Sequence, residues 1–204
     1  AGLDGVAFTD LNTLDGLEEI RAAGREEGLL ALCGVEIATD RGHYLCFFPD
    51  PEKVPAPPQV FGSATPWPVR DVLAKVSELG GAVVAAHPYD KTVEKPSGDF
   101  IFTLDALAAI EGLNAHRKGP ANDLAVEAAD HMSLPCTGAS GAFALEEIGQ
   151  AATLFKEPVA SEADLVRQLR AGAVFCVAIG VTPAGPERGG REGGERRPPR
   201  SDRG

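Results

Sequence analysis

Short apolar runs alternate with amphipathic stretches from residue 3 to residue 178, and this alternation restricts the chain to an α/β fold. Apolar runs of about four to eight residues are typical of buried strands. Such runs occur at Gly5 to Thr9, Leu29 to Val35, His43 to Phe48, Ala82 to Ala86, Ala109 to Leu113, Pro135 to Thr137 and Ala173 to Ala178. Because helical stretches separate most of them, the sequence predicts a parallel α/β sheet.

The intervening stretches carry helix start and stop signals. Predicted helices run from Thr13, capped by Asn12, to about Glu27; from Val69 to Leu79; from Pro120 to Met132; and from a capping box of Ser161 and Asp164 to Gly172. Residues 50–68 form a Pro-rich stretch that predicts a long loop, either a lid or a lost element.

Charge divides the chain into two parts. The net charge is −11, but residues 185–204 hold six Arg against four acids among many Gly and Pro. Such a composition cannot bury enough apolar surface to fold, so we predict one domain over residues 1–180 and a disordered tail over 181–204. An acidic body repels nucleic acid, which leaves the tail as the only expected contact with DNA or RNA.

No apolar run is long enough to span a membrane, and the first ten residues lack the basic start of a signal peptide. The cytoplasm is therefore the expected location. The cysteines at positions 33, 46, 136 and 176 form no CxxC pair, and we expect them to be free thiols.

Polar residues gather where the predicted strands begin or end. Asp10 follows the first strand, Glu36 the second and His87 the run AVVAA, whereas His43 opens its strand. Active sites of α/β folds lie at the carboxyl ends of strands, so Glu36, His43 and His87 could converge on Zn, Mn or Fe. A lone His is more often structural than a ligand, and these residues alone leave both interpretations open.

A second polar cluster follows the run that ends at Leu113. His116, Arg117 and Lys118 could contact an anion at the rim of the fold, with a solvated turn as the alternative. Asp90 and Lys91 follow the run that ends in His87, and we expect them to be exposed loop charges.

The sequence around these residues resembles that of the PHP (polymerase and histidinol phosphatase) domain family. The matching segments appear in the family's order: GLDGVAFTDLNTLDGLEEI, GVEIATDRGHYLCFF, GGAVVAAHPYD and EGLNAHRKGPANDLAVEAADHMSLPCTGAS. The resemblance covers roughly residues 2–178 and implies a distorted seven-stranded (β/α) barrel. It also implies two or three metal ions used for phosphoester hydrolysis, with Glu36, His43 and His87 as ligands and Asp10 as a supporting residue.

The sequence departs from the family pattern at three ligand positions. Leu11 stands where the family has a His, Gly141 where it has an Asp and Phe143 where it has a His. The family's His-x-His motif on its first strand is also absent, so we expect a barrel without that strand. One ion at most could then bind, and an empty site is the alternative.

Three functions fit these observations. The chain could be a hydrolase with residual activity on a phosphorylated small molecule or nucleotide, a non-catalytic barrel used for binding or regulation, or a fragment of an active hydrolase. We favour a catalytically impaired member of the family, because the replaced residues are themselves ligands. A homodimer could cover the open barrel edge.

Overall fold

A computed structural model describes residues 2–117 and 119–179 of the chain. Its strands are β1 (Gly5–Leu11), β2 (Leu30–Thr39), β3 (Gly42–Phe47), β4 (Ala82–Ala86), β5 (Ala109–Asn114), β6 (Cys136–Ala139), β7 (Ala151–Phe155) and β8 (Val174–Ala178). Its α-helices are α1 (Leu17–Glu27), α2 (Pro57–Phe61), α3 (Val69–Glu78), α4 (Ala121–Met132) and α5 (Glu162–Arg170). Short 3₁₀ helices are η1 (Pro51–Lys53), η2 (Gly98–Thr103) and η3 (Leu145–Glu147). The predicted tail over 181–204 and Lys118 lie outside the described residues.

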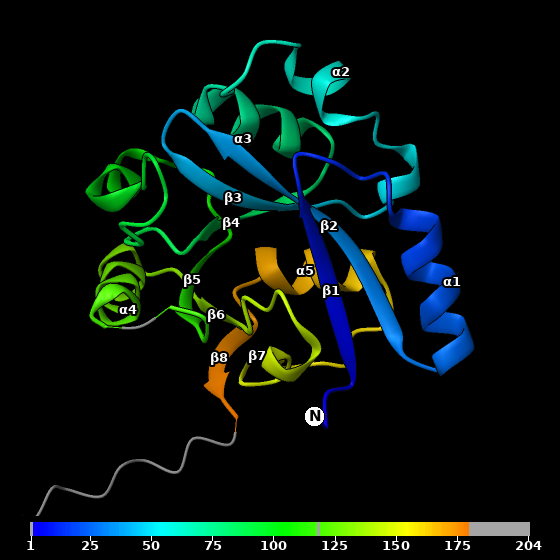
Figure 1. Cartoon of the computed structure of the whole chain (residues 1–204). Coiled ribbons are helices and arrows are strands. Elements are labelled where there is room, and N and C mark those ends of the chain that lie inside the picture. The colour runs from blue at the N-terminus through cyan, green and yellow to red at the C-terminus, as the bar shows by residue number, and fades with distance from the viewer. Residues whose placement is uncertain (1, 118, 180–204) are drawn as a thin grey trace, which may run out of the picture.

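Six strands form one curled sheet in the order β1 to β6, and β7 pairs with β8 in a separate two-stranded sheet (Figure 1). The predicted α/β class is confirmed, but the sheet is mixed rather than parallel, since β3 runs antiparallel to β2 and β4. Only Asp40 and Arg41 separate β2 from β3, and two residues can close a hairpin but cannot make a parallel crossover. The curled sheet is compatible with a PHP-like barrel.

Alternating side chains fill both faces of this sheet. Val83 and Ala85 of β4 pack on the face covered by α3 and α4, where Val72 and Val76 are completely buried. Ala82 and Val84 point to the opposite face, where they meet Leu165 and Leu169 of α5. Burial of each Val or Leu side chain among these stabilises the fold by about 1.5–3 kcal/mol. Figure 1 shows α5 inside the curl of the sheet, with α1, α3 and α4 outside it.

The first helix begins later than predicted. Asn12 does not cap it: the residue has a left-handed φ of 59°, and its Oδ1 accepts a hydrogen bond from the backbone N–H of Ala38. This contact ties the end of β1 to β2, and α1 starts only at Leu17. Ser161 does cap α5, as predicted, by accepting a hydrogen bond from the N–H of Asp164.

Over residues 2–117 and 119–179, no helix combines the length and the hydropathy that crossing a bilayer requires. All four cysteines are free thiols, as expected.

Candidate metal centre

The strand register brings Glu36, His43 and His87 to one place on the inner face of the sheet. Glu36 lies inside β2, not after it, because the hairpin extends that strand to Thr39. His43 pairs with Ala38 on β2 and with Ala86 on β4, and His87 directly follows Ala86. Neighbouring strands therefore deliver the three side chains to the same end of the sheet, on the face that α5 covers farther along.

The three side chains contact one another. The Nδ1 atom of His43 lies 2.6 Å from Oε1 of Glu36, and Nε2 of His87 lies 3.4 Å from the same oxygen. One ligand atom from each residue can be chosen so that all three lie within 4.8 Å of one another. The three residues that the sequence singled out thus lie together.

Glu36 is held as a carboxylate. Burial opposes its ionisation, but hydrogen bonds from His43 and His87, together with their charge, outweigh burial and lower the pKa of Glu36 to about 2. For His87, burial opposes protonation, whereas the carboxylates of Glu36 and Glu111 favour it and raise its pKa. The centre therefore places an ionised carboxylate between two imidazoles, and a cation that binds there would displace the protons that the rings carry.

The donor set fits a divalent metal ion. Two imidazoles and one carboxylate are the ligands of many three-residue Zn sites, and the same mixture accepts Mn or Fe. His87 supports this interpretation, because its side chain is 9% exposed and its Nδ1 atom is buried without a partner among the described residues. A buried polar atom without a partner points to a group bound beside it, such as a water molecule or an ion.

Sequence reasoning missed Glu111, which lies on β5 and is 3% exposed. Its Oε2 accepts a hydrogen bond of 2.7 Å from the backbone N–H of His87 and one of 3.2 Å from Nδ2 of Asn114. The only signal in the sequence was a single acid inside the apolar run AIEGL. Such a residue has no periodic pattern, although an acid within a buried strand requires an explanation.

Arg117 lies beside the centre and forms an ion pair with Asp90, with 2.9 Å between Nε and Oδ2. The expectation that Asp90 is an exposed loop charge is wrong, because it is 5% exposed. Thr92 stabilises the buried carboxylate of Asp90, because its backbone N–H and its hydroxyl both donate to that carboxylate.

Lys118, the other predicted anion-binding residue, lies outside the described residues. Asp10 is exposed on β1, opposite Val35 of β2.

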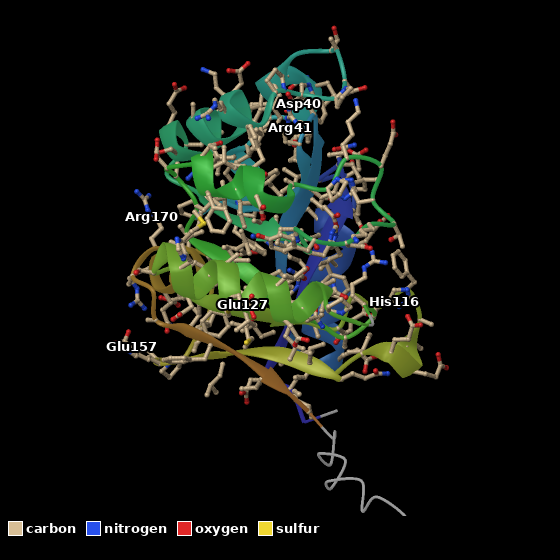
Figure 2. The ribbon with its side chains drawn as sticks, turned by 90° about the vertical axis from the view of Figure 1, so that its left-hand side faces the viewer. Asp40, Arg41, His116, Glu127, Glu157 and Arg170 are labelled. Carbon is tan, nitrogen blue, oxygen red and sulfur yellow. The ribbon has the colours of Figure 1, made fainter. Side chains whose placement is uncertain are left out.

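The three positions that depart from the family pattern carry no ligand atom. Leu11 pairs with Glu36 in the β1–β2 register and is 55% exposed. Gly141 has a left-handed φ of 58°. Phe143 is 84% exposed, and its ring meets the ring of His116 edge-on at 5.3 Å. Figure 2 shows His116 on the opposite side of the molecule from Arg170.

Several proteins resemble this chain. The uncharacterized protein MJ1587 of Methanocaldococcus jannaschii is 35% identical over 126 residues, which are 61% of this chain and 67% of that protein. The family model described as PHP-associated matches residues 119–174.

Solved structures share the fold at low sequence identity. One of them is a predicted metal-dependent phosphoesterase of Bifidobacterium adolescentis. It aligns with a TM-score of 0.56 and 20% identity, and the alignment covers 84% of this chain and 87% of that protein. PsfC of Pseudomonas syringae aligns with a TM-score of 0.66 and 18% identity, and the alignment covers 88% of this chain and 78% of PsfC. The third is a two-domain protein of Bacteroides vulgatus that contains a predicted PHP-like metal-dependent phosphoesterase. It aligns with a TM-score of 0.57 and 16% identity, and the alignment covers 87% of this chain and 57% of that protein.

The matches agree with the geometry of the centre. The family model covers α4 to the start of β8, the solved structures cover most of the described fold, and the motif residues Glu36, His43 and His87 meet at one point. The chain belongs to the PHP domain family.

Proposed function

We propose that this chain binds one divalent cation, Zn, Mn or Fe, through Glu36, His43 and His87, and that it hydrolyses phosphoesters poorly if at all. The convergence of three donor atoms within 4.8 Å supports the single site. The side chains of Leu11 and Phe143 and the bare backbone of Gly141 support the impairment, since none of them can bind a cation. A bound cation would supply positive charge for a phosphoryl oxygen and would polarise a water molecule.

The chain's own residues also suit a phosphorylated ligand. Arg117 is 23% exposed, and its Nε lies 2.9 Å from Oδ2 of the buried Asp90, although the two atoms are not aligned as a hydrogen bond. Its charge is close enough to His87 to oppose protonation of that ring. A guanidinium in this position offers paired donors to phosphate oxygens. We propose a phosphorylated small molecule or nucleotide as the ligand, with Arg117 binding its phosphate.

Metal content and turnover test this function together. Purified protein dialysed against Zn, Mn or Fe should retain close to one equivalent, and Glu36→Gln and His87→Ala should lose it. His131→Ala is the matched control, because His131 lies on α4 and contacts Phe102 instead of the centre. Two or more equivalents per chain, or rapid hydrolysis of p-nitrophenyl phosphate that depends on the metal, would contradict the proposal in favour of an active hydrolase.

A non-catalytic role in binding or regulation is the second candidate. It is favoured by Phe143 and Leu145, two large apolar side chains that are 84% and 82% exposed. They lie in the segment that carries two of the three replaced ligand positions, Gly141 and Phe143. Phosphate binding without any turnover would support this role, whereas turnover that disappears in Glu36→Gln would exclude it.

A further inference from the structure

Glu111 is a carboxylate buried in the interior of the sheet, and nothing in the metal site requires it as a ligand. It lies on β5 with 3% of its surface exposed, and burial raises its pKa. The donors to its Oε2, the N–H of His87 and the amide of Asn114, are uncharged groups. Among the described residues Glu111 forms no salt bridge, although it lies close enough to His87 to favour protonation of that ring. A buried acid without a direct ion pair is costly. Its position calls for a specific role.

The group that Glu111 holds is the backbone of His87. The β4–β5 ladder pairs Val84 with Ala109 and Ala85 with Ile110, and β4 ends at Ala86. The N–H of His87 thus lies past the end of the ladder, where the Glu111 side chain accepts it at 2.7 Å. His87 has a φ of 28°, in the left-handed region that non-glycine residues rarely adopt. Such a conformation persists only where surrounding contacts impose it.

Asn114 fixes the carboxylate in turn. Its Nδ2 donates to Glu111, and its Oδ1 accepts the N–H of His116 at 3.1 Å. Asn122, in the first turn of α4, accepts the N–H of Asn114 at 3.1 Å and donates to its carbonyl oxygen at 3.0 Å. Every polar group of Asn114 is thereby engaged, so its Nδ2 is held in place as a donor to Oε2 of Glu111.

We propose that Glu111 is a positioning residue that holds His87 in its left-handed conformation, so that the imidazole faces Glu36 and completes the cation site. This inference rests on the proposed function, because its consequence is a higher affinity for the metal. Glu111 acts through the backbone of a ligand residue, so it need not touch the ion. Outer residues of this kind typically change metal affinity about 10–100-fold when they are replaced.

Metal-free protein provides the first test. In ¹⁵N spectra of the imidazole rings, Glu111→Ala should shift the His87 resonances, as Glu36→Gln should. Glu111→Gln should restore most of the wild-type pattern, because its amide oxygen can still accept the N–H. Glu78→Ala, which removes an exposed carboxylate from α3, is the matched control. Unchanged His87 resonances in Glu111→Ala would overturn the positioning role whether or not the protein binds metal.

Zinc affinity provides the second test. Glu111→Ala should weaken binding about 10–100-fold without changing its stoichiometry, and Glu111→Gln should weaken it less. Glu78→Ala, which removes an exposed carboxylate from α3, should leave the zinc affinity unchanged. A loss in Glu111→Ala no larger than that in Glu78→Ala would overturn the inference. If Glu111→Ala does not fold, Asn114→Ala replaces it and should give the same His87 shifts in smaller measure. If the wild type binds no zinc but the resonances shift as expected, the proposed function fails while the positioning role stands.

Discussion

Asn114 and Gly141 fit together so closely that residue 141 has no room for a side chain: a Cβ there would overlap the amide oxygen of Asn114. The left-handed backbone at Gly141 disfavours a side chain independently. Asn114 thus occupies the space beside the position where the family resemblance implies an Asp ligand. Asn114 cannot leave this space without losing its hydrogen bond to Glu111, so the packing of β5 disfavours any side chain at residue 141.

Gly141→Ala should therefore destabilise the protein more than its matched control Gly172→Ala. Gly172 has a similar φ of 67°, but a Cβ there meets nothing within 4 Å. The backbone conformation costs about 1–2 kcal/mol at both positions, and we expect the overlap to add about 1–3 kcal/mol at residue 141 alone. Urea unfolding measures both. Equal losses of unfolding free energy would show that Asn114 moves aside freely. For the same reason, Gly141→Asp alone should not raise the metal content.

Leu11→His, in contrast, should strengthen metal binding about tenfold by adding an imidazole beside Glu36. Leu11 pairs with Glu36 across β1 and β2, so both side chains lie on one face, and its exposure of 55% leaves room for the change. Phe8→His is the control, because Phe8 lies three residues earlier on β1 and points to the other face. Competition with a chromophoric chelator measures the affinity. Equal gains from the two variants would mean that a new His acts anywhere on the strand.

Acid should destabilise the metal-free protein through Glu36. Its pKa falls from 4.5 to about 2 on folding, so the carboxylate stabilises the fold above pH 4.5, and this contribution disappears as the pH falls towards 2. The contribution is at most about 3 kcal/mol. In chelator-treated protein, the unfolding free energy of the wild type should drop between pH 5 and pH 2.5 more steeply than that of Glu36→Gln. Parallel pH profiles would show that His43 and His87 do not hold the carboxylate ionised.

Arg117→Gln should weaken phosphate binding by the metal-loaded protein about tenfold while the metal stoichiometry stays unchanged. It should also destabilise the fold by about 2–4 kcal/mol, because Asp90 then lies buried without its cationic partner. Isothermal titration with inorganic phosphate measures the affinity. Arg170→Gln is the control, since Figure 2 shows Arg170 far from His116, the neighbour of Arg117. Unchanged phosphate affinity in Arg117→Gln would leave Arg117 as the structural partner of Asp90 alone.

The sequence predicted much of the fold, because apolar runs determine which segments are buried. The strand Ala82–Ala86 was predicted with its observed bounds, and the bounds of β5 and α3 were each wrong by one residue. The antiparallel direction of β3 was not predicted, and the strand β7 was missed. Pairing direction depends on how two residues turn between β2 and β3. The run AATLF of β7 is short and only partly buried, and it pairs with β8 outside the main sheet.

The sequence singled out the three side chains that lie together at the candidate site. Glu36, His43 and His87 stand in motifs, whereas the groups that hold them were found only in three dimensions. Glu111 and Asn114 come from one strand and act on His87, which follows another, so no spacing in the sequence links them. The burial of Asp90 was missed for the same reason, since its partner Arg117 lies 27 positions along the chain in a different loop.

Anomalous diffraction from crystals grown with zinc tests the central claim most directly. We predict one peak per chain, within about 2.0–2.2 Å of a ligand atom from each of Glu36, His43 and His87. A second peak beside the first, or no peak between these side chains at saturating zinc, would contradict a single-cation centre.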